Sequence, residues 1–259
     1  MTKSYKKFLD VAIFAAKSAG AIQLEKLGRV EHIKLKGEAD LVTEVDVMCE
    51  ERIKEIIQSK YPGHEILAEE SGGGKGRYRW IVDPLDGTTN YAHAYPFFCT
   101  SIALEIDGVI VVGVVYNPLS EELFTAMRGS GAFLNGKAIY VSKVSKLENA
   151  MAGTGFPYER EMRLGLSLEL FRRMIGPVQA IRRDGSAALN LCYVAAGRFD
   201  LFWELTLHPW DIAAGCLMIE EAGGKVTRID GSAMELGAPD IAASNSILHS
   251  ALIRTLKGG

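Results

Sequence analysis

The sequence lacks the cysteine and histidine patterns that mark zinc sites and disulfide-stabilised folds. Its 4 cysteines include no C-x-x-C pair, and its 5 histidines form neither H-E-x-x-H nor H-x-H. We therefore predict no zinc site and four buried, reduced thiols, as is usual in a reducing compartment. These thiols belong to Cys49, Cys99, Cys192 and Cys216.

Long apolar runs are also absent from the sequence. No stretch reaches the ~18 uninterrupted apolar residues that a membrane span needs. An apolar run near the N-terminus follows several lysines, as in a signal peptide, but Asp10 and Lys17 cut it short. We therefore expect an amphipathic first helix, no membrane segment and a cytoplasmic protein.

Neither sign of charge is in large excess. The 32 acidic and 29 basic residues leave a formal net charge of −3. This near balance provides no basic surface for nucleic acid and no polybasic run for a membrane, so the expected partner is a small molecule or another protein. With 259 residues, 48 % of them hydrophobic, the chain can bury a core without disulfides or a structural metal.

The first half of the chain, 1–150, is predicted to hold two helices followed by a mainly antiparallel sheet. Apolar periodicity indicates a helix at about 5–27, and a second helix should run from the N-cap Thr43 to Tyr61. Asp107-Gly108 and Asn135-Gly136 are expected to form tight turns between strands. The predicted strands are 65–68, 79–82, 97–105, 109–116, 122–126, 132–134 and 138–141.

The second half, 151–259, is predicted to form a mixed α/β region. Its expected strands are 152–155, 178–182, 199–204, 225–227 and 241–243. These strands alternate with helices expected near 161–174, 186–196, 211–222 and 246–256. Because no internal repeat and no low-complexity linker interrupts the chain, we expect one unit over residues 1–259.

One segment concentrates residues that bind cations and phosphates. The apolar run that begins at Trp80 ends in Asp83-Pro-Leu-Asp-Gly-Thr-Thr. The proline favours an extended Asp83, and the Asp-Gly turn could then bring both carboxylates and the Leu85 carbonyl around one hard cation. Gly87 permits close approach of a ligand, and Thr88 could open a helix whose free N–H groups receive a phosphate. The alternative is an ordinary turn in which the second aspartate bonds its own backbone.

Further acidic residues lie outside this segment. Glu69 and Glu70 end an apolar run abruptly, as if a second strand delivered charge to the same sheet edge, although a solvated loop is the alternative. Asp211 precedes a helix of small residues and could be a plain N-cap. Asp46 lies three residues after Thr43, where a capping box is the alternative role.

Together these segments resemble the signatures of the inositol monophosphatase family. The stretch 83–90, Asp-Pro-Leu-Asp-Gly-Thr-Thr-Asn, resembles the first signature, and 210–215, Trp-Asp-Ile-Ala-Ala-Gly, resembles the second. Residues 69–71 are similar to the family's acidic strand end, and 41–46 to its early helix. The resemblance covers nearly the whole chain. It implies a five-layered αβαβα sandwich, in the layered α+β or α/β class, and Mg²⁺-dependent hydrolysis of a small phosphate monoester.

The resemblance also implies two bound Mg²⁺ ions, with Mn²⁺ as an alternative metal. Glu69, Asp83 and the Leu85 carbonyl would hold the first ion. Asp83, Asp86 and Asp211 would hold the second. Carboxylate and carbonyl oxygens agree with these hard cations rather than with zinc.

The family's catalytic group is carried over to three residues. Thr88, oriented by Asp46, would position and deprotonate a metal-activated water for in-line attack on phosphorus, without a phosphorylated residue. Glu70, next to Glu69, would support a third and weaker Mg²⁺. The N–H groups of Gly87 and Thr88 would hold the phosphoryl oxygens.

Substrate contacts are implied at a helix start and at a strand end. They are Gly185, Ser186, Ala187, Glu204 and Asp211, together with Gly87 and Thr88. Glu204 would accept two hydroxyl groups of a polyol, whereas a solvated strand-end glutamate is the alternative. Arg182 and Arg183 would lie at the cleft edge or, alternatively, one would be exposed and the other ion-paired.

The continuation Thr89-Asn90-Tyr91 is more similar to the inositol-type branch than to the phosphoadenosine phosphatases. Inositol 1-phosphate is therefore the expected substrate, in a homodimeric and lithium-sensitive enzyme. Dual activity on fructose 1,6-bisphosphate is an alternative that the loop at 30–42 would decide. NADP, phosphoadenosine phosphate and histidinol phosphate are further alternatives, and an accessory protein of the transcription machinery is the alternative of a different class.

Overall fold

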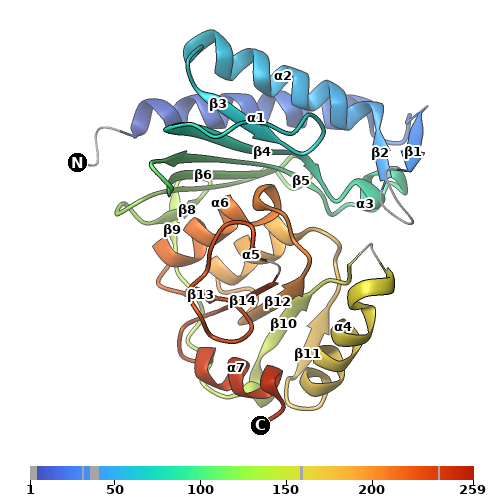
Figure 1. Ribbon diagram of the computed structural model, residues 1–259, viewed down its shortest axis with the longest axis vertical. Coiled ribbons are helices and arrows are strands. Elements are labelled where there is room, and N and C mark those ends of the chain that lie inside the picture. Colours follow the sequence, from blue (N-terminus) through green and yellow to red (C-terminus); the bar gives the residue numbers. More distant parts are fainter. Residues whose placement is uncertain (1–4, 31, 36–40, 158–159, 239) are drawn as a thin grey trace.

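The structure, a computed structural model, describes residues 5–30, 32–35, 41–157, 160–238 and 240–259. Its helices and sheets stack in five layers (Figure 1). The outer layers each hold two helices: α1 (Lys6–Lys26) with α2 (Glu44–Lys60), and α4 (Arg160–Ile175) with α7 (His249–Lys257). The central layer holds α5 (Ala187–Ala195) and α6 (Pro209–Glu221). This order of layers confirms the predicted αβαβα sandwich.

The first sheet has seven strands in the order β3-β4-β5-β6-β7-β8-β9. Their bounds are Glu65–Ala68, Tyr78–Asp86, Cys99–Ile106, Val109–Asn117, Glu122–Met127, Ala132–Leu134 and Lys137–Ile139. Strands β3 and β4 pair in parallel, and the other neighbours pair antiparallel. Asp107-Gly108 and Asn135-Gly136 form the predicted tight turns, with positive φ at all four residues, as a twisted hairpin requires.

The second sheet has five strands in the order β11-β10-β12-β14-β13. In chain order, β10 to β14 span Met151–Thr154, Ala180–Arg182, Leu201–Leu205, Lys225–Thr227 and Asp240–Ser244. Strand β10 pairs in parallel with β11 and β12, whereas β14 pairs antiparallel with β12 and β13. The second sheet is therefore mixed.

Smaller elements lie around the two sheets. Strands β1 (Ile33–Leu35) and β2 (Leu41–Thr43) form a separate antiparallel pair, which the sequence did not predict. The short helices are α3 (Thr88–Ala92) and η2 (Leu147–Asn149). The loop expected to decide substrate choice, 30–42, lies partly outside the described residues, at 31 and 36–40. None of the described helices has the length and apolar character that crossing a membrane requires.

Three clusters of buried side chains hold the layers together. One lies between the first sheet and helices α1 and α2, a second surrounds α5 and α6, and a third lies beneath α4 and α7. The central helices pack closely, because a Cβ added to Gly215 of α6 would lie 2.6 Å from Leu191 Cβ of α5. The four cysteines are free and buried, as predicted.

Element boundaries differ from the predicted ones where local backbone conformation decides them. Helix α6 begins at Pro209 rather than at 211, because proline suits the first helical position. Helix α7 begins at His249 rather than at 246, since Ser246 has a φ of +67° and cannot join a right-handed helix. Strand β4 continues to Asp86, beyond the predicted end at 82.

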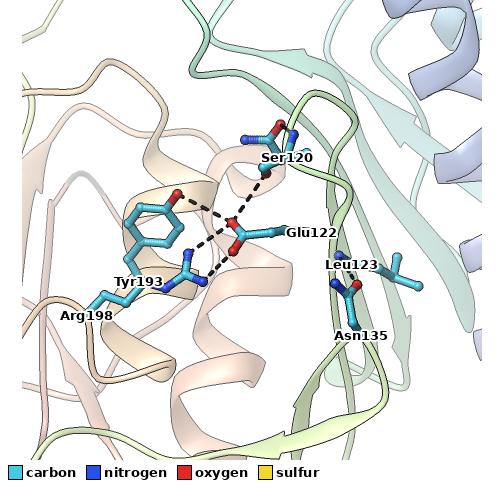
Figure 2. Close-up of polar contacts among 7 residues, drawn as sticks. Ser120, Glu122, Leu123, Asn135, Tyr193 and Arg198 are labelled. Atoms are coloured by element: carbon cyan, nitrogen blue, oxygen red, sulfur yellow. Dashed lines mark hydrogen bonds and ion pairs between the residues drawn. The ribbon is translucent and has the colours of Figure 1, made fainter.

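Glu122 of β7 ties the first sheet to the end of α5 (Figure 2). Its carboxylate accepts hydrogen bonds from Arg198 Nη1 at 3.0 Å and from the Tyr193 hydroxyl at 3.5 Å. The Ser120 hydroxyl donates to the same carboxylate at 3.4 Å. The Arg198 guanidinium also lies 4.6 Å from the centroid of the Tyr193 ring. Because the other end of α5 begins at the Ser186 cap, this contact helps to fix that cap relative to the first sheet.

Candidate active site

An irregularity in β4 directs Asp83 and Asp86 to the same side of the first sheet. Asp83 pairs with Ser101 of β5 and Asp86 with Cys99, so three steps along β4 match two along β5. In a regular strand, residues three apart point to opposite faces, and one extra residue reverses that alternation. Asp83 is 2 % exposed, and its Oδ1 accepts a 3.0 Å hydrogen bond from the Leu85 N–H. The bulge therefore delivers two carboxylates to one strand end.

The chain turns at Gly87 and opens helix α3 at Thr88. Gly87 has a φ of +99°, and a Cβ there would lie 2.9 Å from the Phe97 carbonyl oxygen. Both the backbone angle and the lack of space for a side chain therefore require glycine. The turn brings Thr88 Oγ1 within 2.9 Å of Asp46 Oδ1 and 3.0 Å of the Leu85 carbonyl oxygen. A hydroxyl group thus lies between a carboxylate from α2 and a carbonyl from β4.

Asp46 has a separate partner for each carboxylate oxygen. Its Oδ2 accepts hydrogen bonds from the Thr43 N–H at 2.8 Å and from the Thr43 hydroxyl at 2.6 Å. The bond from the Thr43 N–H is part of the capping box that the sequence offered as an alternative role. The capping box leaves Oδ1 for Thr88, and Asp46 is fully buried. The start of α2 therefore fixes the carboxylate that faces the Thr88 hydroxyl.

Asp86 is held by the start of α5. Its Oδ2 accepts hydrogen bonds from the Ser186 hydroxyl at 2.6 Å and from the Ala188 N–H at 2.7 Å. Ser186 is the N-cap of α5, and its hydroxyl oxygen also accepts a 3.3 Å bond from the Leu189 N–H. Burial raises the pKa of Asp86 to about 6, although the two bonds to Oδ2 favour the charged form. The first sheet and the central helices therefore meet at this carboxylate.

Asp211 reaches the same region from the first turn of α6. Its Oδ2 accepts a 2.6 Å hydrogen bond from the N–H of His208, which is the cap residue. The alternative of Asp211 as the N-cap is therefore wrong, because the helix begins two residues earlier. The pKa of Asp211 is raised well above its usual value, first by burial and then by the charge of Asp86.

The acids of this site repel one another. The pKa of Asp83 is raised well above its usual value, first by burial and then by neighbouring acids. These neighbours are Glu69, Asp86 and Asp211. The Glu69 N–H donates to the Val82 carbonyl at 3.2 Å, which places Glu69 beside the end of β4. None of the ion pairs in the described parts of the chain includes Asp83, Asp86 or Asp211.

The chemistry of these donors fits Mg²⁺ or Mn²⁺, although their arrangement is not a finished metal site. Among the described residues, no three His, Cys, Asp or Glu side chains form a ready-made set of metal ligands. The carboxylates instead accept hydrogen bonds from the Leu85 N–H, the Ser186 hydroxyl and the His208 N–H. Oxygen donors suit hard cations, and a divalent cation would relieve the repulsion between these carboxylates.

Glu70 lies beside a different cavity. Its N–H donates to Glu50 Oε2 at 2.9 Å, and Glu70 lines a cavity of about 820 Å³ beside α2 and β2. Thr43 lines the same cavity, so this space adjoins the residue that holds Asp46. The structure does not bring Glu70 into the cavity that Asp86 lines, and its catalytic role stays a prediction.

A smaller cavity, of about 80 Å³, lies beside Asp86. It brings together several predicted substrate contacts, namely Gly185, Ser186, Ala187, Glu204 and Asp211. Arg183 also lines this cavity, as expected of a residue at the cleft edge, whereas Gly87 and Thr88 do not line it. Burial raises the pKa of Glu204 to about 8, although the charge of Arg183 opposes that shift.

Several cavity residues had no signal in the sequence, Gly155 and Asn190 among them. A Cβ added to Gly155 would lie 1.9 Å from Glu204 Oε1, so only glycine leaves room for this carboxylate. Asn190 of α5 lines the cavity and is 1 % exposed. Both lie outside the signature segments, and the contact of Gly155 with Glu204 joins the end of β10 to β12. A sequence pattern along one element cannot reveal such a contact.

The layered fold and the cluster of acids beside a small cavity are those of a metal-dependent phosphoric monoester hydrolase. Residues 4–258 match the model of the inositol monophosphatase family. The chain belongs to that family.

Named relatives match almost the full length of the chain. Inositol monophosphatase 3 of Solanum lycopersicum is 44 % identical and covers 98 % of this chain and 97 % of its own. The Nus factor SuhB of Pseudomonas aeruginosa is 43 % identical, with 96 % and 95 % covered. The fructose-1,6-bisphosphatase/inositol-1-monophosphatase of Aquifex aeolicus is 40 % identical, with 98 % and 97 % covered.

A solved structure has the same fold. The crystal structure of the extragenic suppressor protein suhB from Bartonella henselae superposes with a TM-score of 0.94 at 44 % identity. The match covers 98 % of this chain and 99 % of that one, so the whole fold is shared.

Proposed function

We propose that this protein hydrolyses inositol 1-phosphate to inositol and phosphate in a Mg²⁺-dependent reaction. The observation that carries the proposal is the 2.9 Å contact between Thr88 Oγ1 and Asp46 Oδ1, beside buried acids that repel one another. A hydroxyl group held in this way can accept a proton from water while its own proton passes to the carboxylate. Capping of α2 needs only the other oxygen of Asp46, so the contact is free to serve chemistry.

Two Mg²⁺ ions are proposed to bind at this site, and Mn²⁺ can replace them. The proposed ligands, all oxygen donors, are Glu69, Asp83, Asp86, Asp211 and the Leu85 carbonyl. Asp83 would serve as a ligand of both ions, and a third, weaker ion is proposed beside Glu70. When bound, Mg²⁺ lowers the pKa of a water molecule and neutralises charge on the oxygen that leaves.

The residues of the chain orient the attack and stabilise the phosphate. Thr88 Oγ1 accepts a proton from the attacking water while its own proton passes to Asp46 Oδ1, which also holds the hydroxyl group in place. The N–H groups of Gly87 and Thr88 are proposed to hold the phosphoryl oxygens. The nearby thiol of Cys99 is not proposed as a nucleophile, because burial raises its pKa well above the usual value and keeps it protonated. Direct attack by water predicts inversion of configuration at a chiral phosphate, whereas a phosphoenzyme predicts retention.

The small cavity supports a compact polyol as the alcohol part of the substrate. Its volume of about 80 Å³ is well below the ~300–1,000 Å³ typical of pockets for drug-sized molecules, which favours a small alcohol part. Glu204 supplies acceptor oxygens for hydroxyl groups.

Dual activity on fructose 1,6-bisphosphate is the main alternative within the same class. Arg183 lines the cavity, and a guanidinium group can bind a second phosphate through two parallel hydrogen bonds. The relative from Aquifex aeolicus carries both activities in its name. Comparing initial rates on inositol 1-phosphate, fructose 1,6-bisphosphate, NADP, phosphoadenosine phosphate and histidinol phosphate tests the proposal. We expect the highest kcat/KM with inositol 1-phosphate. A higher kcat/KM with any other ester would contradict inositol 1-phosphate as the preferred substrate.

A second candidate function is an accessory role in transcription. It rests on the Pseudomonas aeruginosa relative that is named a Nus factor. A pulldown from cell extract should compare the native protein with Asp211→Asn, which removes a proposed metal ligand. Recovery of transcription proteins with both forms would support this role, and recovery with neither would contradict it.

Three further properties are proposed from the family resemblance. The protein is proposed to be a homodimer, to be inhibited by Li⁺ and to be located in the cytoplasm. The four free, buried thiols support a reducing compartment. Light scattering, a LiCl titration of activity and cell fractionation test these properties in turn.

A further inference from the structure

Gln23 is a polar residue on the buried face of an otherwise apolar helix surface. Helix α1 is described in full, and its other buried residues are leucine, alanine or glycine. Gln23 is fully buried, and its amide oxygen has no hydrogen-bond partner among the described residues. Burying an amide in this way costs free energy, so packing of the core does not explain a glutamine at this position. The contacts of its amide nitrogen do explain it.

The amide nitrogen of Gln23 holds a backbone carbonyl of β4. Its Nε2 donates to the Pro84 carbonyl at 2.8 Å and to Thr100 Oγ1 at 2.9 Å. The Thr100 hydroxyl donates to the same carbonyl at 3.1 Å. Because a carbonyl only accepts hydrogen bonds, the glutamine must present its nitrogen rather than its oxygen to Pro84. Side chains from α1 and from β5 therefore hold one carbonyl oxygen together.

The Pro84 carbonyl belongs to the bulge that makes Asp83 and Asp86 converge. Between these two aspartates the register of β4 against β5 shifts, so that two residues lie opposite Thr100. A bulge interrupts the regular ladder, and its backbone groups then need partners other than the neighbouring strand. Gln23 supplies such a partner from a different layer of the fold.

The hydrogen bond from Gln23 reaches Asp83 through one peptide group. The Pro84 carbonyl and the Leu85 N–H belong to the same planar trans peptide, so they point in opposite directions. That N–H donates to Asp83 Oδ1 at 3.0 Å. Holding the carbonyl therefore also sets the direction of the N–H that binds the carboxylate. Helices α1 and α6 lie on opposite sides of the first sheet, so Gln23 acts from behind the acid cluster (Figure 1).

We propose that Gln23 is a positioning residue for the metal site, holding the 84–85 peptide so that its N–H orients the Asp83 carboxylate for the cations. An ionised carboxylate has about four acceptor sites, so the bond from Leu85 leaves others for metal ions. The same peptide leads into the Leu85 carbonyl, which is another proposed ligand. The inference rests on the proposed function and adds to it a residue, outside every signature segment, that sets how tightly the metals bind.

Metal binding in the absence of substrate tests this role. Gln23→Met keeps the length of the side chain and removes both hydrogen bonds that the amide donates. Tyr91→Phe is the matched control, because the buried Tyr91 hydroxyl donates to the main-chain carbonyl of Gln23 at 2.7 Å and does not touch Pro84. Electron paramagnetic resonance measures free Mn²⁺ during a titration of each protein. We expect the Kd for Mn²⁺ to be ~10-fold weaker in Gln23→Met, the low end of what partners of metal ligands contribute, and unchanged in Tyr91→Phe.

A role in folding alone predicts a different result. It would lower the unfolding temperature of Gln23→Met in EDTA and leave its Kd for Mn²⁺ unchanged, which would overturn the proposal. Equal weakening of Mn²⁺ binding in Tyr91→Phe would overturn it as well, because the effect would then belong to the packing of α1. If Gln23→Met fails to fold, Thr100→Val decides by the same criteria, because it removes the second donor to the Pro84 carbonyl.

Kinetics of the loaded protein provide a second readout. In Gln23→Met we expect the Mg²⁺ concentration that gives half the maximal rate to rise ~10-fold. At saturating Mg²⁺ the KM for inositol 1-phosphate should equal that of the native protein, because Gln23 acts on the metal ligands and not on the substrate. A higher KM with an unchanged Mg²⁺ requirement would contradict the proposal.

Metal binding and hydrolysis separate this inference from the proposed function. If Gln23→Met weakens Mn²⁺ binding but the native protein releases no phosphate from inositol 1-phosphate, the inference stands and the proposed function fails. If the native protein hydrolyses the ester but binds Mn²⁺ no more tightly than Gln23→Met, the inference fails and the proposed function stands. If the native protein binds no Mn²⁺, the inference fails.

Discussion

Asp46 Oδ1 lies 2.9 Å from Thr88 Oγ1, which joins the first turn of α2 to the first residue of α3 across 42 positions of the chain. The other oxygen of the same carboxylate closes the capping box of α2. The folding of one helix start therefore sets the position of a hydroxyl group in another element. This coupling makes the Thr88 hydroxyl a sharp target for mutation.

Replacing Thr88 with valine should remove the hydroxyl group while keeping the shape of the side chain. We expect kcat to fall by ~10²–10⁴, the range that a general base supplies, because proton transfer from the attacking water is lost. Thr88→Ser keeps the hydroxyl group and should keep most of the rate. Steady-state phosphate release by the two variants measures the difference, and similar rates in both would contradict the role of Thr88.

Asp83→Asn should separate activity from stability. The change removes a ligand proposed for both ions, so the rate should fall at least ~10³-fold even with saturating Mg²⁺, a loss of ~4 kcal/mol in transition-state stabilisation. In EDTA the same change removes a buried charge that neighbouring acids repel, so the variant should unfold at a higher temperature than the native protein. Near-normal turnover, or a lower unfolding temperature in EDTA, would count against the proposed acid cluster.

Gly155→Ala should weaken substrate binding by displacing Glu204. The added Cβ would lie 1.9 Å from Glu204 Oε1, so the carboxylate must move out of its position in the cavity. We expect KM for inositol 1-phosphate to rise ~10-fold, about 1.4 kcal/mol, the order of a lost hydrogen bond. Gly165→Ala is the matched control, because nothing lies within 4 Å of a Cβ there. An equal KM in both variants would contradict a role of Glu204 in binding the substrate.

His249 should make folding sensitive to acid. The imidazole is 4 % exposed and lies between the hydroxyl groups of Thr227, at 2.9 Å, and Ser244, at 2.8 Å. Burial lowers its pKa from 6.5 to about 4, so between these values the unfolded chain binds a proton that the folded one does not. The contribution of the neutral, buried His249 to the free energy of unfolding is therefore fully present above pH ~6.5 and is lost as the pH falls toward 4.

Urea unfolding of the native protein and of His249→Asn at pH 7.5 and pH 5 measures this effect. We expect the difference in unfolding free energy between the two proteins to shrink by about 2 kcal/mol at the lower pH. Comparing the two proteins cancels the titration of groups that they share. A difference that does not change with pH would contradict the protonation of His249 on unfolding.

Local patterns predicted the parts of the site that lie within one segment. The turn after Asp86, the capping box at Asp46 and the position of Asp211 at a helix start follow from residue chemistry over a few positions. The convergence of Asp83 with Asp86 also depends on a bulge against β5, which no pattern along β4 reveals. The turns at Asp107-Gly108 and Asn135-Gly136 were predictable for the same local reason, since their residues adopt positive φ readily.

Contacts between distant elements were beyond the reach of the sequence. Gly155 carries no signal until β10 is placed beside β12 and Glu204 fills the space where its side chain would lie. In the sequence Asn190 resembles an ordinary helix residue, and only the structure shows that it lines the cavity. Glu70 follows Glu69 directly, yet it lines a different cavity from that of Asp86, and its N–H donates to Glu50 Oε2.

Phosphate release from inositol 1-phosphate by the purified protein, with and without Mg²⁺, tests the proposed function most directly. We expect release that saturates with both substrate and Mg²⁺, stops when EDTA is added and returns when Mg²⁺ is restored. Release that continues in EDTA, or no release with either Mg²⁺ or Mn²⁺, would contradict the proposal.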